Sequence, residues 1–237
     1  MNDSIRLEPN KIIKTIDLLE KRVADRFPNS GLNTLCLQFL NTTQKTKQSI
    51  EWISSPNITL RVFSYLIILI GLGGLVYSIT YIDLKLGKTT LANVVTISEA
   101  IFNDIILLGA AIFFLVSLES RLKMKRALKS LNELRVIAHV IDMHQLTKDP
   151  NVTDLSESAT ENSPKRSLTP FQLQRYLDYC SEATALVGKV AALYSQSLPD
   201  EKVVRAVNEI EILTTGLSRK IWQKLIILNN SNSHKNK

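Results

Sequence analysis

The chain has 237 residues, of which 45% are hydrophobic and 22% are charged, and its formal net charge is +7. The positive charge is spread along the chain and not gathered in one arm, so we expect no nucleic-acid partner. The two cysteines, Cys36 and Cys180, are too few for a disulfide framework and lack the spacing of zinc ligands. No nucleotide-binding or other cofactor motif is present in the sequence, and we expect no cofactor.

Residues 1–57 are predicted to form a helical hairpin. A first helix over 9–27 carries apolar residues at the a/d spacing of a coiled coil, namely Ile12, Ile16, Leu19 and Val23. Pro28 ends this helix, and Ser30 is a suitable N-cap for a second helix over 31–53. Each helix has one apolar stripe, which we expect it to bury in a bundle.

Two apolar segments in the middle of the chain predict a transmembrane hairpin. Val62–Ile82 contains no charged residue, and Ile105–Leu118 is also free of charge. About 20 apolar residues are enough for a helix to cross the hydrocarbon core of a bilayer. We therefore expect a hairpin over 58–118, with spans at about 60–82 and 97–118 and an outer loop at 83–96.

Basic residues flank the open end of this hairpin. Arg61 lies at the start of the first span, and a cluster follows the second span at Arg121, Lys123, Lys125 and Arg126. Between and beside the spans, Asp83 and Glu99 balance Lys85 and Lys88, so the connecting end has no excess of positive charge. The positive-inside rule then predicts that both termini are cytoplasmic. We expect the basic residues to set this topology and to contact lipid headgroups.

The second span is predicted to continue as one long cytoplasmic helix. Apolar residues keep a helical spacing through 119–149, and neither Gly nor Pro interrupts residues 110–149. No stretch shows the alternation of a strand. The predicted fold class is therefore all-α, with a two-span transmembrane helical hairpin, a cytoplasmic helical bundle, and a second span that extends into the bundle.

The remaining segments alternate between polar linkers and helices. Residues 150–168 are rich in Ser, Thr, Asn and Glu, and we expect a disordered loop there. Thr169 and Pro170 suit a helix start, so residues 169–229 predict a second helical hairpin. The polar tail at 230–237 is expected to be disordered.

Asn103 and Asp104 are unusual because they fall within the predicted second span. An ionisable group inside a bilayer costs about 2.5–3.5 kcal/mol at the midplane and usually faces protein or water. The pair is therefore a candidate for lining a pore or contacting another subunit. The alternative is that the span begins later and leaves Asp104 at the interface.

Small residues lie on one face of each predicted span. Such residues let helix backbones approach closely within lipid. The candidates are Gly71, Gly74 and Ser78 on the first span and Gly109 and Ala110 on the second. They predict close helix packing, either inside one hairpin or between subunits.

A polar cluster near the end of the long helix is the only candidate for metal chemistry. His139 and Asp142 are three residues apart and share a helical face. His144 lies about 140° further round the helix from His139 and does not join them easily. Arg135 precedes the cluster. Polar contacts to a neighbouring helix are the alternative interpretation.

These patterns predict an integral membrane protein without an evident catalytic site. We expect it to self-associate as a homo-oligomer and to couple a partner- or signal-binding cytoplasmic bundle to the lipid bilayer. An oligomeric pore or another membrane effector is the concrete form of this expectation. One alternative is a passive membrane scaffold or assembly factor for a soluble cytoplasmic protein. Another is a metal-dependent enzyme that uses the His139 and Asp142 region. The abundance of Asn, Lys and Ile, without a eukaryotic targeting signal, favours a bacterial plasma membrane.

Overall fold

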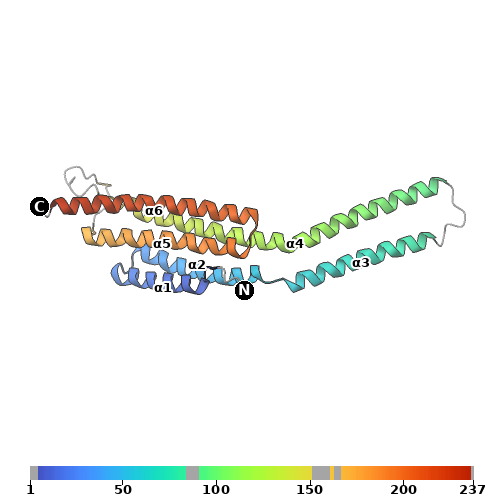
Figure 1. The fold of residues 1–237 in the computed structure, drawn as a ribbon, viewed down its shortest axis with the longest axis horizontal. Helices are drawn as coiled ribbons and strands as arrows, with labels where there is room; N and C mark the ends of the chain where they lie inside the picture. Colours follow the sequence, from blue (N-terminus) through green and yellow to red (C-terminus); the bar gives the residue numbers. More distant parts are fainter. Residues whose placement is uncertain (1–4, 84–90, 151–160, 163–166, 236–237) are drawn as a thin grey trace. The chain divides into compact units, whose positions relative to one another are not determined.

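The computed structural model describes residues 5–83, 91–150, 161–162 and 167–235 (Figure 1). Within these residues the chain is helical and contains no strand, which confirms the all-α class. The helices, in chain order, are α1 (Pro9–Arg26), α2 (Gly31–Ser54), α3 (Ile58–Asp83), α4 (Leu91–Leu146), α5 (Pro170–Ser197) and α6 (Glu201–Lys235).

The helices form two compact units. The bundle unit contains the residues up to Ser54 and those from Arg126 onward, and the apolar unit contains residues 55–125. The predicted long helix is confirmed, because α4 is one uninterrupted helix of 56 residues. It belongs to both units, and the division falls between Lys125 and Arg126.

In the bundle unit, α1, α2, α5, α6 and the later part of α4 lie side by side (Figure 1). The seam predicted for α1 is buried, with Ile16, Leu19 and Val23 at 0% exposure. The later part of α4 buries Leu131, Leu134, Ala138 and Ile141 in the same way. Side chains at helical spacing on each element thus form one shared apolar core.

The ends of the bundle helices follow local sequence signals. The Ser30 Oγ accepts a hydrogen bond of 3.2 Å from the Asn33 N–H and caps α2, as predicted. The preceding turn contains Asn29 at φ 58°, a left-handed conformation that asparagine tolerates. Thr169 forms a reciprocal capping box with Gln172 at the start of α5, which also confirms the predicted helix start.

Two helix boundaries differ from the sequence-based expectation. α4 begins at Leu91, so part of the predicted outer loop at 83–96 is helical, because a helix does not have to begin where an apolar segment begins. α6 continues to Lys235, although its last residues are polar. The rest of the predicted loop and most of the polar segment at 150–168 lie outside the described residues.

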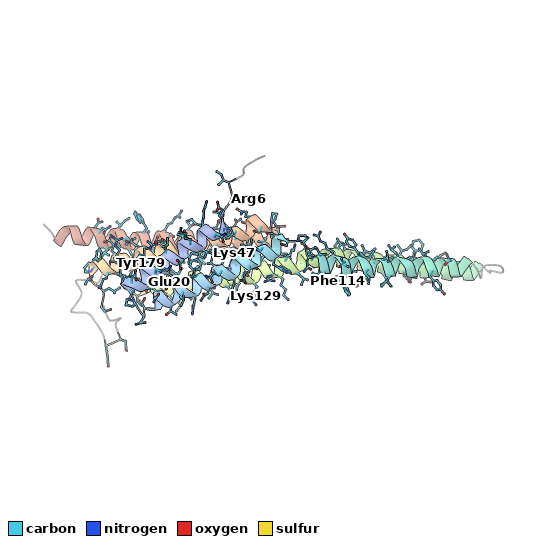
Figure 2. The ribbon with its side chains drawn as sticks, turned by 90° about the horizontal axis from the view of Figure 1, so that it is seen from below. Arg6, Glu20, Lys47, Phe114, Lys129 and Tyr179 are labelled. Carbon is cyan, nitrogen blue, oxygen red and sulfur yellow. The ribbon has the colours of Figure 1, made fainter. Side chains whose placement is uncertain are left out.

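The apolar unit contains α3 and the first part of α4. Both helices are long and apolar enough to cross a membrane, by length and composition. The buried share of their most apolar stretches is only 6% and 0%. Leu69 and Phe113 are 72% and 70% exposed, and Phe114 projects outward from the ribbon (Figure 2). These helices are therefore not core helices within this chain.

Candidate functional site

A carboxylate joins the two helices of the apolar unit. The Glu119 Oε2 on α4 accepts a hydrogen bond of 2.7 Å from the Arg61 Nε on α3. The Glu119 Oε1 lies 2.9 Å from the Lys123 Nζ and accepts a hydrogen bond of 3.0 Å from the Asn57 N–H. We call these four residues the Glu119 clamp. The clamp ties the start of α3 to α4.

Local structure explains why these groups meet. Asn57 caps α3, because its Oδ1 accepts from the Leu60 N–H at 3.3 Å. The carboxylate thus lies at the N-terminal end of α3, where the helix dipole favours negative charge. Lys123 is one helical turn beyond Glu119, and its Nζ also donates to the Ser55 carbonyl oxygen at 2.7 Å.

The clamp strongly favours the ionised form of its carboxyl group. Hydrogen bonds from Arg61, then Lys123, then the Asn57 N–H lower the pKa of Glu119 to about 2. The two cations outnumber the single carboxylate. The clamp therefore carries an excess of one positive charge at neutral pH.

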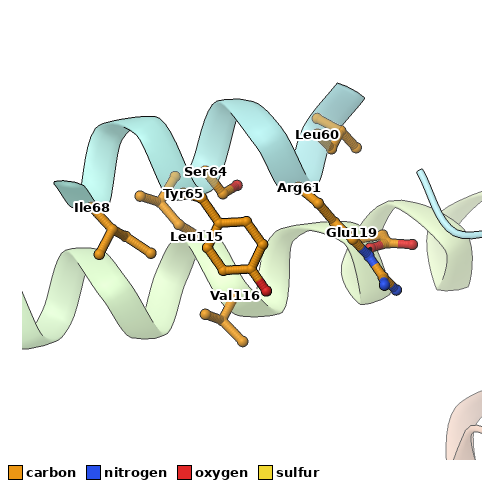
Figure 3. Close-up of a pocket in the computed structure, with 8 residues that line it drawn as sticks. All are labelled: Leu60, Arg61, Ser64, Tyr65, Ile68, Leu115, Val116 and Glu119. Atoms are coloured by element: carbon orange, nitrogen blue, oxygen red, sulfur yellow. Dashed lines mark hydrogen bonds and ion pairs between the residues drawn. The ribbon is translucent and has the colours of Figure 1, made fainter. Parts of the chain in front are cut away.

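A crevice of about 190 Å³ adjoins the clamp between α3 and α4 (Figure 3). Its polar end contains Arg61 and Glu119, and Ser64 forms part of the wall with only 9% of its surface exposed. The other lining residues are Leu60, Tyr65, Ile68, Leu115 and Val116. The crevice thus combines charged groups at one end with an apolar wall.

The basic residues predicted to contact lipid headgroups have different surroundings. Arg61 and Lys123 are engaged by Glu119. The guanidinium carbon of Arg126 lies 4.7 Å from the ring centroid of Trp52, and that of Arg121 lies 5.9 Å from the Phe114 centroid. Lys125 is exposed. Headgroup contact remains a prediction for all five basic residues.

Asn103 and Asp104 are both exposed on the apolar part of α4. Neither side chain lines the crevice beside the Glu119 clamp. Two polar residues therefore lie within an apolar stretch of helix, as the sequence indicated. A pore-lining or subunit-contact role for them remains a prediction.

Of the predicted small residues, Gly71 packs inside the hairpin, whereas Gly74 and Gly109 leave space for contacts outside it. A Cβ at Gly71 would lie 2.8 Å from the Leu108 Cδ1, so this glycine allows α3 and α4 to approach closely. A Cβ at Gly74 or Gly109 would have no neighbour within 4 Å among the described atoms. Ala110 is also exposed, and the side chain of Ser78 lies outside the described part of the structure.

The predicted polar cluster on α4 does not converge on one point. Arg135 Nη2 donates to the Glu209 Oε2 on α6 at 2.5 Å, whereas His139 is exposed. The Asp142 Oδ1 accepts a hydrogen bond of 2.6 Å from the Gln145 Nε2. The described residues contain no group of three or more His, Cys, Asp or Glu that could hold a metal ion.

His144 packs instead on the first residue of α2. A Cβ at Gly31 would overlap the imidazole ring, with the Nε2 only 3.2 Å away. Burial, together with the nearby Lys148, lowers the pKa of His144. The neutral ring is therefore the form that fits this contact.

The C-terminal end of α4 is bound by a lysine of α6. Lys224 Nζ donates to the backbone oxygen of Gln145 at 2.6 Å, which satisfies a carbonyl at the helix C-terminus. Burial lowers the pKa of Lys224. Lys148 Nζ lies 5.4 Å from the ring centroid of Tyr176 on α5. The last turn of α4 thus contacts α2 and α6, and Lys148, two residues after the helix ends, contacts α5.

Sequence reasoning missed Glu119, Gly31 and Lys224 as organising residues. Glu119 offered one signal, because a glutamate four residues before a lysine is a known helical pair. Its bond to Arg61 joins residues 58 positions apart, and the sequence gives no sign of that pairing. The contact of Gly31 with His144 likewise depends on how α2 and α4 pack.

We compared the chain with protein families, curated proteins and solved structures, and none of them matches it.

Proposed function

We propose that the protein is an integral membrane protein in which α3 and the first part of α4 cross the bilayer. The observation that supports this most directly is the exposure of their apolar surface, because a core helix would be mostly buried. Contiguous apolar patches of this size are rare on soluble monomers. A bilayer covers such helices while their backbone hydrogen bonds remain satisfied internally.

The proposed topology places both termini and the bundle unit in the cytoplasm. The basic residues Arg121, Lys123, Lys125 and Arg126 follow the apolar part of α4, and Arg61 lies at the start of α3. The positive-inside rule counts Lys and Arg near span ends and gives little weight to acidic residues. Pairing with Glu119 therefore leaves this argument intact.

We further propose that α4 couples the bundle to the membrane. A helix of 56 residues is about 84 Å long, and no break interrupts it. Its last turn contacts α2 and α6 through His144 and Gln145, and Lys148, just after the helix end, contacts α5. A partner or signal that shifts this end of the bundle would act on a helix that also forms a span.

Self-association is the second part of the proposal. Two spans alone are too few to enclose a transport path, so a pore would need several copies. The open Cβ positions at Gly74 and Gly109 support helix contacts outside the hairpin. Asp104 on the same helix is costly to leave in lipid and would gain from a protein or water environment.

The test is the mass of the full-length protein in nanodiscs, measured by mass photometry. Self-association predicts a discrete oligomer, and Gly74→Leu or Gly109→Leu should shift it toward monomer. Ala111→Leu is a matched control, since Ala111 is also exposed on the same part of α4. A monomer at all protein concentrations would contradict self-association. Asp104→Leu should change conductance or assembly, and the pore version fails if both are unchanged.

A scaffold for a soluble cytoplasmic protein is the alternative function. It is supported by large apolar side chains exposed on the outer face of α6, where Ile212 and Trp222 are 74% and 64% exposed. Exposed tryptophans often anchor protein interfaces. The scaffold version predicts that Trp222→Ala abolishes partner binding while the mass of the assembly is unchanged. No contact in the described structure favours a metal-dependent enzyme.

A further inference from the structure

The crevice beside the Glu119 clamp is bounded by both helices of the apolar unit. Figure 3 shows Ser64 and Ile68 on α3 facing Leu115 on α4, and the Arg61 side chain extending toward Glu119. The wall away from the clamp is therefore mostly apolar, with Ser64 as a polar residue within it, and the charged groups lie where the crevice adjoins the clamp. An occupant that fits both parts must itself be amphiphilic.

The charged end favours an anion. Arg61 and Lys123 face one carboxylate, so the clamp has one positive charge in excess. The bond from Arg61 to Glu119 uses Nε, and 54% of the Arg61 side chain is exposed. A guanidinium has five N–H donors, so the terminal nitrogens of Arg61 remain able to bind an oxyanion.

We propose that this crevice binds one anionic phospholipid from the adjoining leaflet. The phosphate oxygens accept hydrogen bonds from the terminal nitrogens of Arg61, and one acyl chain lies along Ile68, Leu115 and Val116. Tyr65, which is 67% exposed at the edge of the crevice, has the amphipathic character of an interfacial aromatic residue. This inference depends on the proposed membrane insertion.

A free phosphate ion shares the headgroup chemistry but leaves the apolar wall without an occupant. An apolar molecule without charge would leave the excess charge of the clamp uncompensated. A bound lipid satisfies both ends and bridges α3 and α4 where the clamp already joins them. The site thus differs from general attraction of basic residues to an anionic membrane surface, because it needs the crevice as well as the charge.

The test is native mass spectrometry of the full-length protein released from nanodiscs of phosphatidylglycerol mixed with phosphatidylcholine. We expect one retained phosphatidylglycerol per chain. Arg61→Gln should reduce its retention roughly tenfold, the effect of losing a charged hydrogen bond. Lys125→Gln removes the same charge from an exposed residue outside the crevice and should leave retention unchanged.

A second pair of variants tests whether lipid retention depends on the space in the crevice as well as on its charge. Leu115→Trp fills the crevice and should abolish retention, whereas Leu107→Trp changes a 68% exposed residue of the same helix and should not. Ile68→Trp, from the opposite wall, repeats the test if Leu115→Trp does not fold. Circular dichroism of each variant establishes that its helices are intact.

Four results would overturn the proposal, and the first three concern retention. They are equal retention of both lipids, equal losses for Arg61→Gln and Lys125→Gln, and retention that survives both tryptophans in the crevice. Displacement of the lipid by an equal concentration of inorganic phosphate would also contradict it, since it would show a headgroup-only site. Carbonate extraction of membranes that contain the expressed protein reports insertion separately. Protein that is inserted but shows no selective retention overturns this inference and leaves the proposed function standing.

Discussion

At the scale of single residues, the contact between His144 and Gly31 links α4 to α2. The ring fits because Gly31 has no Cβ, and its burial beside Lys148 lowers the pKa of His144. Gly31 also begins α2, whose N-terminal end disfavours a positive charge nearby. Both effects favour the neutral imidazole.

Bundle stability should therefore fall as the solution becomes mildly acidic. Below the ordinary histidine pKa of about 6.5, the unfolded chain binds a proton that the folded chain resists. The free energy of unfolding then decreases with falling pH until the lower folded pKa is passed. Thermal unfolding of the full-length protein between pH 7.5 and 5.5 measures this slope.

His144→Gln should remove most of that slope. His139→Gln is the matched control, because His139 lies on the same helix but is exposed. If both variants keep the slope of the original protein, the Gly31 contact is not its source.

The Glu119 clamp allows a second test at the residue scale. Because more than half of the Arg61 side chain is exposed, solvent screens its pairing with Glu119, and the coupling between the two residues should be small but measurable. A double-mutant cycle with Arg61→Gln and Glu119→Gln measures this energy in detergent. The pairing of Glu133→Gln with Arg61→Gln should show no coupling, since Glu133 lies in the other unit. Equal coupling in the two cycles would contradict a specific clamp.

The pKa of Glu119 sets the pH range of this contribution. In the folded protein the pKa of Glu119 is lowered to about 2 from its ordinary value of 4.5. Its stabilisation is complete above about pH 4.5 and is lost as the pH falls toward 2. The coupling energy should therefore be the same at pH 7 and pH 5.5.

At the scale of elements, α5 and α6 approach each other closely at one glycine. A Cβ at Gly188 would lie 3.2 Å from the Thr214 Oγ1, which is tighter than usual, whereas a Cβ at Gly216 meets nothing within 4 Å in the described structure. Both glycines lie inside helices. They therefore share the low helix propensity of glycine and differ in the space available.

Replacing each glycine by alanine should have different effects on stability. Gly216→Ala should raise the free energy of unfolding by about 1 kcal/mol, because alanine is the better helix former. Gly188→Ala gains the same propensity but must displace Thr214, so it should be less stable than Gly216→Ala by about 1 kcal/mol. Chemical denaturation of the two variants gives the comparison. Equal stability would mean that the α5–α6 contact is looser than described.

The sequence predicted the elements well because their signals are local. The seam of α1 has helical spacing, and Ser30 and Thr169 mark helix starts by side chain type alone. The contacts between elements were not predictable, since the bonds of Glu119 to Arg61 and of Lys224 to Gln145 join distant positions. The start of α4 and the end of α6 also differed from expectation, because neither boundary has a local stop signal in the sequence.

At the scale of the whole molecule, one chain combines a unit that has a buried core with a unit whose apolar surface is exposed. The buried seams of the bundle unit account for its folding in water. No comparable burial covers the exposed apolar residues of α3 and of the first part of α4 in water. The proposed insertion into a bilayer would resolve this difference, and it would also account for the basic residues near the start of α3 and after the apolar part of α4.

The central claim is that lipid covers side chains that the protein itself leaves exposed. Impermeant maleimide labelling of single added cysteines in sealed proteoliposomes tests this directly. The background is low, because Cys36 and Cys180 are buried and burial raises the pKa of both thiols.

Gly87→Cys, between α3 and α4, should label from one side only, and Asn132→Cys on the bundle unit from the other side only. Leu107 is 68% exposed in the structure. Its replacement Leu107→Cys should nevertheless label from neither side until the lipid is removed. Rapid labelling of Leu107→Cys in intact proteoliposomes, or labelling of Gly87→Cys and Asn132→Cys from the same side, would contradict the account.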